Sequence, residues 1–251
     1  MPTSSSPWQD PATVQQFLRN VRGAVPLAIE QIEIMLQVVA AAREQVRSFL
    51  DLGCGDAVLA AAILEEHPHA RGVLLESSEG MLDAARHRLR EDVSRLDFVL
   101  ADVEQPGGLE KVSALGPFDA IVSAFALHGI EERRKREIFA ACAQVLLPGG
   151  IFISIEHVAS ATRWSQSPAD DLLIDAIFGE AMTRSPGKTR AEVAQEYYAQ
   201  ASRVGQAAAP LEVQCDWLRQ AGFDNVDCFL KVQELAVFGG QRVGGTGISD
   251  Q

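Results

Sequence analysis

Long apolar runs are absent from this 251-residue chain. No stretch reaches the roughly 18 consecutive apolar residues that a membrane-spanning helix needs, and the N-terminus lacks basic residues followed by an apolar core, the pattern of a secretory leader. Cysteine is also scarce: Cys54, Cys142, Cys215 and Cys228 stand singly, with no C-x-x-C pair. We therefore expect a cytoplasmic protein with reduced thiols, no membrane span and no metal site.

Basic charge is in short supply too, with 22 Lys and Arg residues against 34 Asp and Glu residues and a formal net charge of −12. Such a chain is repelled by nucleic-acid backbones unless a local basic patch attracts them. The one strongly basic run, Arg133 to Arg136, is flanked by glutamates on a predicted helix whose other face is apolar. That pattern is typical of a solvated helix face, so we expect no nucleic-acid partner.

The chain does contain enough apolar sequence for one substantial core, since 47% of its residues are hydrophobic. Between residues 46 and 157, apolar strand-like runs alternate with helical patterns. This order predicts right-handed crossovers and a mostly parallel sheet. Ligands of such sheets bind at the carboxyl ends of the strands.

A glycine-rich turn follows the first predicted strand, in the run Arg47 to Ala60. Glycines at 53 and 55 allow positive φ and a close approach of the backbone to a ligand. A phosphate-binding loop would need Lys and Ser or Thr where this chain has Asp56 and Ala57, and a pyrophosphate would meet the carboxylate of Asp56. The turn therefore favours a nucleotide-like ligand that is cationic rather than anionic.

Two acids end the next two predicted strands. Glu76 follows Asp51 by 25 residues (76 − 51), and Asp102 follows the third strand. A carboxylate at the first position can accept hydrogen bonds from the 2′ and 3′ hydroxyls of a ribose. A carboxylate at the second could accept a bond from an adenine amino group.

In this order, the motifs resemble the class I S-adenosylmethionine-dependent methyltransferases. The resemblance rests on Asp51 to Gly55, Glu76, Asp102, the strand that ends at Ser123, and Leu147 to Gly150. It implies an α/β fold with a Rossmann-like, seven-stranded, mostly parallel sheet and an antiparallel last strand. It also implies S-adenosylmethionine as the methyl donor and S-adenosylhomocysteine as the product.

The resemblance further implies a set of cofactor-binding residues. Arg22 is expected to reach the methionine carboxylate, and Ser123 and Ala124 to offer backbone carbonyls to the amino group of the donor. The full set is Arg22, Asp51, Gly53, Cys54, Gly55, Glu76, Ser77, Met81, Asp102, Val103, Ser123 and Ala124. Ala57 departs from the pattern, because many members have a third glycine there, and we interpret it as a variant of the turn.

We expect one domain over residues 1–251, in five segments. N-terminal helices occupy 12–45 and the cofactor-binding core 46–157. Residues 158–210 break the alternation and are predicted to form a helical lid over the site. A closing helix and C-terminal hairpin follow over 211–240, and 241–251 form a tail.

The expected chemistry is in-line displacement of the sulfonium methyl by a small-molecule acceptor. The protein mainly has to align the two reactants and exclude water, and it needs a base only where the acceptor arrives protonated. Candidates for the catalytic residues follow the fourth and fifth strands or lie in the lid: His128, Glu156, His157, Tyr197 and Tyr198.

Acidic residues in the expected lid mildly favour an amine acceptor, and pairing of lid helices would give a homodimer. Two alternatives to methyl transfer stay open. The region from Trp217 to Gly240 and the run Arg19 to Pro26 resemble the carboxy-S-adenosylmethionine synthases, although Leu27-Ala28 departs from the residues usual there. The other alternative is a non-catalytic protein that binds S-adenosylmethionine.

Overall fold

The computed structural model describes residues 25–184, 187–204 and 208–242. Arg22 and the first part of the expected N-terminal helical segment, residues 12–24, lie outside the described residues. The strands are β1 (Ser48–Leu52), β2 (Arg71–Glu76), β3 (Leu96–Leu100), β4 (Phe118–Ala124), β5 (Leu146–His157), β6 (Asp224–Val232) and β7 (Leu235–Gln241). The helices are α2 (Ala28–Ala42), α3 (Val58–Glu66), α4 (Glu79–Arg88), η4 (Val93–Arg95), α5 (Glu110–Ser113), α6 (Glu132–Val145), α7 (Arg163–Arg184), α8 (Arg190–Val204) and α9 (Leu211–Gln220).

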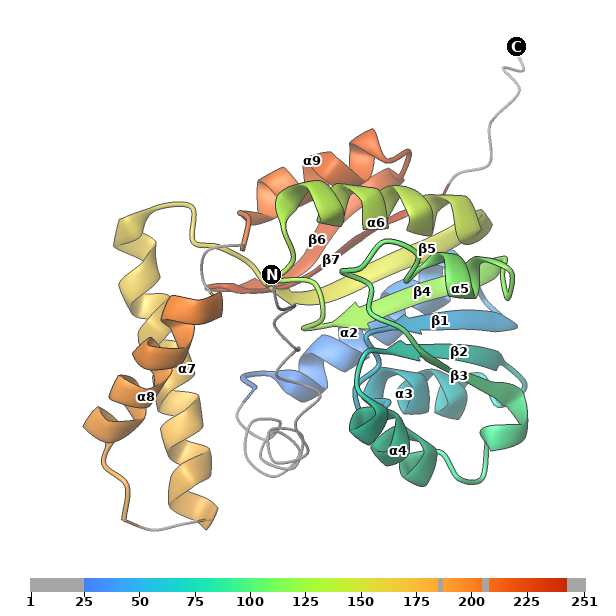
Figure 1. The fold of residues 1–251 in the computed structure, drawn as a ribbon. Helices are drawn as coiled ribbons and strands as arrows, with labels where there is room; N and C mark the ends of the chain where they lie inside the picture. Colours follow the sequence, from blue (N-terminus) through green and yellow to red (C-terminus); the bar gives the residue numbers. More distant parts are fainter. Residues whose placement is uncertain (1–24, 185–186, 205–207, 243–251) are drawn as a thin grey trace.

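The seven strands form one sheet in the order β3-β2-β1-β4-β5-β7-β6 (Figure 1). Strands β1 to β5 pair in parallel, whereas β7 runs antiparallel to both of its neighbours. The predicted fold class, including the antiparallel last strand, is therefore confirmed. The chain reverses its direction of travel across the sheet between β1 and β4, which makes these two strands the topological switch point.

Helices cover both faces of the sheet, and each face has its own core. On one face, Leu50 and Leu52 of β1 pack with residues of α5, α6 and α9. On the other, Phe49 packs with residues of α2, α3 and α4. This split follows from the alternation of side chains along a strand, and it explains why the neighbouring residues Phe49 and Leu50 are both apolar: β1 is buried from both sides.

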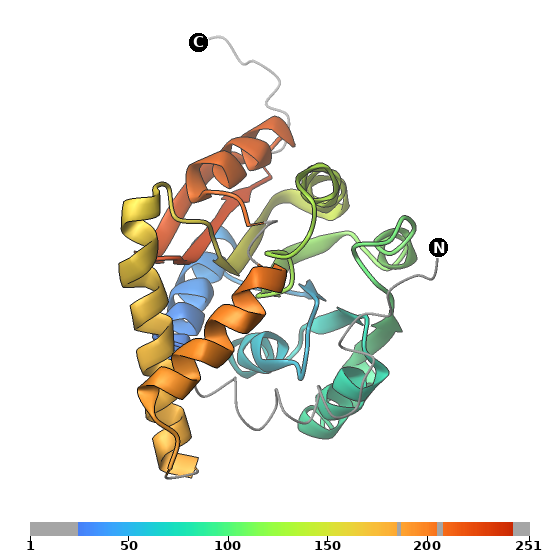
Figure 2. The same cartoon turned by 60° about the vertical axis from the view of Figure 1, so that its left-hand side comes forward.

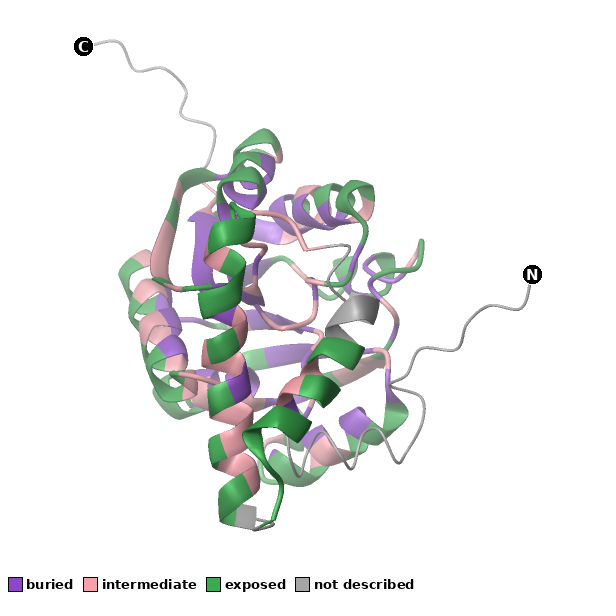
Figure 3. Ribbon diagram, turned by 90° about the vertical axis from the view of Figure 1, so that its left-hand side faces the viewer, coloured by how far each residue is buried: buried purple, intermediate pink, exposed green. Residues whose placement is uncertain are grey.

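Helices α7 and α8 form a hairpin that stands beside the sheet, on the side toward which the β4 arrow points (Figures 1 and 2). Both helices are largely exposed or intermediate, whereas the strands seen behind them are buried (Figure 3). The hairpin leaves and rejoins the body through residues 158–160 and 208–210, which we call the neck. Ala159 and Pro210 pair there in an isolated bridge, and the amide of Ala159 donates to the carbonyl of Ala209 at 3.1 Å.

Within the described ranges, none of the helices has both the length and the apolar character to cross a membrane.

Candidate functional site

The glycine-rich turn and the loop after β4 meet at the switch point. Gly53 has φ +72°, and a Cβ placed on it would lie 2.3 Å from the Cβ of Ala126. Only glycine fits there, because both the backbone conformation and the space exclude a side chain. Gly55, at φ +54°, is different: a Cβ on it would meet no atom within 4 Å. The surface of the turn is therefore open at Gly55 and closed at Gly53.

Glu76 ties the glycine-rich turn to the end of β2. Its Oε2 accepts from the amide of Gly55 at 3.0 Å, and its Oε1 accepts from the amides of Ser77 and Ser78 at 2.8 and 3.0 Å and from the Ser77 hydroxyl at 3.1 Å. The side chain is buried. Because Oε2 accepts only one of these bonds, it keeps a lone pair for a ligand at the open side of the turn.

Asp51 organises the start of α3. Ala57 precedes the helix at φ +62° and offers no side-chain cap, so it takes the backbone conformation that a glycine would take more easily. Instead, Oδ2 of the buried Asp51 accepts from the amide of Ala60, in the first turn of the helix, at 3.1 Å. Burial raises the pKa of Asp51 to about 7, and the charges of Glu76 and Asp56 add to this effect.

The turn is thus surrounded by acids. Asp56, which the sequence places where a pyrophosphate would bind, is buried and pairs with Arg88 at 2.8 Å. Burial, with Asp51 and Glu76 nearby, raises the pKa of the Cys54 thiol well above its usual value. The Cys54 thiol is therefore neutral, and its contact with a cationic ligand stays a prediction.

The remaining cofactor candidates lie around the same edge of the sheet. Oδ1 of Asp102 accepts from the amide of Glu104 at 2.9 Å. The hydroxyl of Ser123 donates to the carbonyl of Leu52 at 2.8 Å, so this side chain joins β4 to β1. Val103 and Met81 are buried, and Ala124 ends β4 with intermediate exposure. These roles in cofactor binding stay predictions.

A buried carboxylate links the ends of β4 and β5. Glu156 is fully buried. Its Oε2 accepts from the amide of Leu127 at 2.8 Å, and its Oε1 contacts Nδ1 of His128 at 3.0 Å and accepts from the amide of His157 at 3.0 Å. The acid therefore shapes the loop after β4 and orients the imidazole of His128, which is 27% exposed.

The pKa of His128 is raised above its usual value. Burial lowers it, but the charge of Glu156 and the hydrogen bond to that carboxylate outweigh burial. Nδ1 of the ring faces Glu156, and a hydrogen bond with the backbone of Phe125 also raises the pKa of His128. This is the arrangement of a carboxylate-oriented general base.

Lys135 is a site residue that the sequence interpretation missed. We predicted that the basic run of α6 faces solvent, and for Lys135 this was wrong: the side chain is fully buried. Its Nζ donates to the carbonyl of His128 at 3.1 Å, and burial lowers its pKa. A signal was present, because Lys135 shares helical spacing with the apolar residues Ile138, Phe139 and Cys142.

A second histidine–carboxylate pair lies next to the first. Nε2 of His157 contacts Oε2 of Glu234 at 2.9 Å, and the His128 and His157 rings meet edge-on with centroids 6.3 Å apart. Glu234 lies in the two-residue turn between β6 and β7 and is buried. Sequence reasoning missed it, since the register of β7 against β5 brings this turn to the end of β5.

The α7–α8 hairpin brings one of the two candidate tyrosines toward this group. The Tyr197 hydroxyl donates to Asp170 Oδ1 at 3.0 Å, and Glu234 and His157 both act on the pKa of Asp170, which burial raises. Tyr198 packs against Tyr197 but is 52% exposed. Tyr197 is therefore the tyrosine nearer to the histidines.

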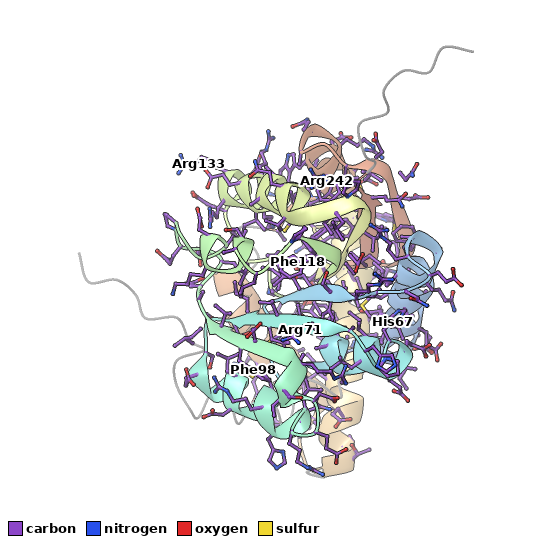
Figure 4. All side chains as sticks on the ribbon, turned by 90° about the vertical axis from the view of Figure 1, so that its right-hand side faces the viewer. His67, Arg71, Phe98, Phe118, Arg133 and Arg242 are labelled. Atoms are coloured by element: carbon purple, nitrogen blue, oxygen red, sulfur yellow. The ribbon has the colours of Figure 1, made fainter. Side chains whose placement is uncertain are left out.

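A cavity of about 380 Å³ lies at the other end of the sheet. It is lined by Arg43, Gln45, Arg47, Ser48, Asp119 and Leu147. Figure 4 views this end, where Arg71 and Phe118 begin β2 and β4. It is remote from the candidate residues that the structure describes, which lie at the carboxyl ends of the strands. Across the described part of the chain, no three His, Cys, Asp or Glu side chains group as a metal site.

Comparison with known proteins agrees with this geometry. Residues 49–150 match the family model of a methyltransferase domain. Over 230 residues the chain is 24% identical to a carboxy-S-adenosyl-L-methionine synthase of Nitratiruptor sp., covering 91% of this chain and 90% of that protein. Over 119 residues it is 30% identical to a phenazine-1-carboxylate N-methyltransferase of Pseudomonas aeruginosa, covering 47% of this chain and 33% of that protein.

Among solved structures, PigF with S-adenosylhomocysteine superposes with a TM-score of 0.58 at 21% identity. The match covers 93% of this chain and 60% of PigF. At this identity the likeness establishes the fold, and the chain spans about three fifths of the length of that protein.

Proposed function

Since residues 49–150 match the family model of a methyltransferase domain, we propose that the protein is a class I S-adenosylmethionine-dependent enzyme that methylates a small molecule whose acceptor atom carries a proton. The observation that carries this proposal is the His128–Glu156 pair at the carboxyl ends of β4 and β5, 3.0 Å apart. A base is useful only where a proton must leave the acceptor. The acceptor is thus a hydroxyl compound or an amine rather than an atom that is already free of protons.

The residues at the glycine-rich turn fit S-adenosylmethionine. Gly55 leaves the turn open, and Glu76 keeps a lone pair beside it for a ribose hydroxyl. The acids Asp51 and Glu76 suit a ligand that carries positive charge, whereas Asp56 is already paired with Arg88. When bound, the cofactor supplies a methyl group already activated on a sulfonium centre.

The chain's own contribution is then to position the acceptor and to take its proton. Glu156 favours the protonated imidazole of His128, so the proton can rest there after it leaves the acceptor. Lys135 fixes the carbonyl of the same residue. Neither Glu156 nor Lys135 has to touch the acceptor, because each acts through the position and the charge of His128.

We assign the α7–α8 hairpin the role of a lid. Asp170 and Tyr197 are the hairpin residues that approach His157 and Glu234. The carboxylates at this junction, Asp170, Glu234 and Glu156, disfavour an anionic acceptor and favour a neutral or cationic one. An amine therefore fits the lid side of the site, as does a neutral phenol.

Synthesis of a carboxylated donor is the second candidate, favoured by the match to the Nitratiruptor synthase along nearly its whole length. That reaction needs cations free to hold a carboxylate. In the hairpin, however, Lys188 pairs with Glu196 at 2.7 Å, and Arg190 with Asp171 at 2.7 Å and with Asp175. Lys188 and Arg190 are thus neutralised within the hairpin, and this removes two of the cations that could hold a carboxylate.

The test combines calorimetry with an acceptor screen. We expect micromolar binding of S-adenosylmethionine and S-adenosylhomocysteine, followed by methylation of members of a panel of phenols and amines. His128→Ala should lower turnover by about 10²- to 10⁴-fold without weakening cofactor binding, whereas the matched control His87→Ala, at an exposed histidine of α4, should behave as wild type. Mass spectrometry of the cofactor distinguishes the methyltransferase from the synthase. A synthase would convert S-adenosylmethionine to a carboxylated derivative and would methylate none of the phenols and amines. Absence of cofactor binding would contradict both reactions.

A further inference from the structure

Glu234 is a buried acid in a place where acids are normally exposed. It occupies the two-residue turn between β6 and β7 with Gln233, whose φ is +54°. Two-residue hairpin turns favour pairs such as Asn-Gly, so turn geometry gives no reason for a glutamate here. Yet its side chain is only 8% exposed. A charge that loses its water needs compensating partners, and Glu234 has them.

Among the described residues, the hydrogen bonds of Glu234 beyond the β6–β7 strand pair fall on one short segment, residues 157–160. Oε2 contacts the ring of His157 at 2.9 Å, Oε1 accepts from the amide of Ser160 at 3.0 Å, and its backbone carbonyl accepts from the amide of Val158 at 2.7 Å. Residue 157 is the last residue of β5, and residues 158–160 are the part of the neck that follows it. One residue thus bonds to both the site and the base of the hairpin.

The two oxygens of the Glu234 carboxylate contact different groups. The Oε2 contact holds the His157 ring with Nε2 toward the β6–β7 turn, and this ring lies edge-on to the ring of His128. The Oε1 contact holds Ser160, one residue beyond the bridge that Ala159 makes with Pro210. Residues Asp170 and Tyr197 of the hairpin face the same cluster from the other side.

We propose that Glu234 is a positioning residue that holds His157 at the acceptor end of the site and fixes the neck of the α7–α8 hairpin, so that the ring and the hairpin keep one relative placement. This inference rests on the proposed function, since it concerns the acceptor end of the same site. It assigns no proton transfer to Glu234. The residue acts through His157 and the neck.

The experiment compares Glu234→Ala, which removes both oxygens, with Glu234→Gln, which keeps an acceptor of the same length. Glu65→Ala, at an exposed glutamate near the end of α3, is the matched control. Nuclear magnetic resonance of the protein without ligands follows the Nε2 proton of His157 and hydrogen exchange at the Ser160 amide. If Glu234→Ala does not fold, Glu234→Asp replaces it, because a side chain one methylene shorter cannot reach both partners at once.

We expect Glu234→Ala to lose the His157 Nε2 proton signal and to raise exchange at Ser160 by at least about tenfold. Glu234→Gln should stay within about twofold of wild type in exchange, because its amide oxygen can still accept. With the most active acceptor of the phenol and amine panel, Glu234→Ala should raise KM by about tenfold and change kcat much less, since it loosens acceptor placement and leaves His128 intact.

Retention of the His157 signal in Glu234→Ala would overturn the proposal, even if exchange at Ser160 rises, because Glu234 would then be an anchor of the neck alone. Unchanged exchange would overturn it as well. These readouts need no acceptor and no cofactor. If they change as expected while every acceptor stays unmethylated, the proposed function fails and the role of Glu234 stands.

Discussion

Replacing Glu156 by Gln tests the centre of the candidate site. The wild-type carboxylate is fully buried and accepts from the amides of Leu127 and His157 while it contacts Nδ1 of His128. A glutamine has nearly the same shape but one oxygen and one NH₂ group. Whichever way the amide turns, at least one buried N–H now faces another donor, and the charge that attracts the imidazolium is gone.

The expected loss of stability follows from these contacts. Leaving a buried donor without an acceptor costs about 1–3 kcal/mol, and a hydrogen bond to a charged group contributes about 1.5–3 kcal/mol. We expect Glu156→Gln to lower the free energy of unfolding by about 2–4 kcal/mol in all. For a chain of this size that corresponds to a fall in Tm of about 5–15 °C.

The loss should depend on pH in a definite direction. Because the folded pKa of His128 is raised, its ionisation stabilises wild type fully below the ordinary histidine pKa. This contribution disappears as pH rises through the folded value. The stability gap between wild type and Glu156→Gln should therefore be widest in acid and narrow with rising pH. In the variant the pKa of His128 falls, so the rise of activity with pH should begin at lower pH, with a lower plateau from a weaker base.

Thermal denaturation across pH and pH–rate profiles of methyl transfer measure the two effects. Glu65→Gln, an exposed substitution in α3, controls for loss of a negative charge elsewhere. Superimposable pH–rate profiles for wild type and Glu156→Gln would refute the idea that Glu156 sets the ionisation of His128. A stability gap that widens with rising pH would refute the sign of the linkage.

Three further outcomes follow from the same structure. Glu76→Gln should weaken S-adenosylmethionine by about 10- to 100-fold through impaired ribose bonds, measured by calorimetry, and wild-type affinity would remove Glu76 from the cofactor site. Lys135→Met should move the rise of the pH–rate profile to higher pH, because Lys135 lowers the pKa of His128; a shift to lower pH would contradict this. Cofactor binding near pH 7 should release protons, because a cation lowers the pKa of Asp51 from about 7; calorimetry in two buffers of different ionisation enthalpy detects this, and equal heats would contradict it.

The sequence predicts best what depends on local pattern. The ends of β1, β2, β4 and β5 carry the residues expected there, because glycine and strand alternation mark where each strand stops. Ala57 is also accounted for, since it takes the positive φ of the glycine that it replaces. His128 and Glu156 were both candidates, but their 3.0 Å contact depends on parallel pairing of β4 with β5 and could not be read from either segment alone.

The features that the sequence did not predict also depend on contacts between distant segments. Glu234 reaches His157 across 77 positions of sequence through the antiparallel register of β5 and β7. Lys135 looks like one charge of a solvated run; its helical spacing places it on the apolar face, but its contact with the loop after β4 could not be foreseen. Glu76 was predicted as a ribose ligand, yet its four hydrogen bonds to the turn and to the start of α4 were not foreseen. A sequence does not show which backbone groups a side chain will bind through hydrogen bonds.

Because of the neck, the α7–α8 hairpin is a segment that can be replaced as a unit. Ala159 and Pro210 are already bridged, so the chain between them can lengthen, shorten or be replaced without altering the register of any strand. The glycine-rich turn and Glu76 lie in a separate part of the chain. The residues that recognise the donor can therefore stay the same during evolution while the sequence of the hairpin changes. When residues 161–208 are grafted from one relative into another, the recipient should therefore acquire the acceptor preference of the source. Natural enzymes of this kind can change their acceptors by the same route.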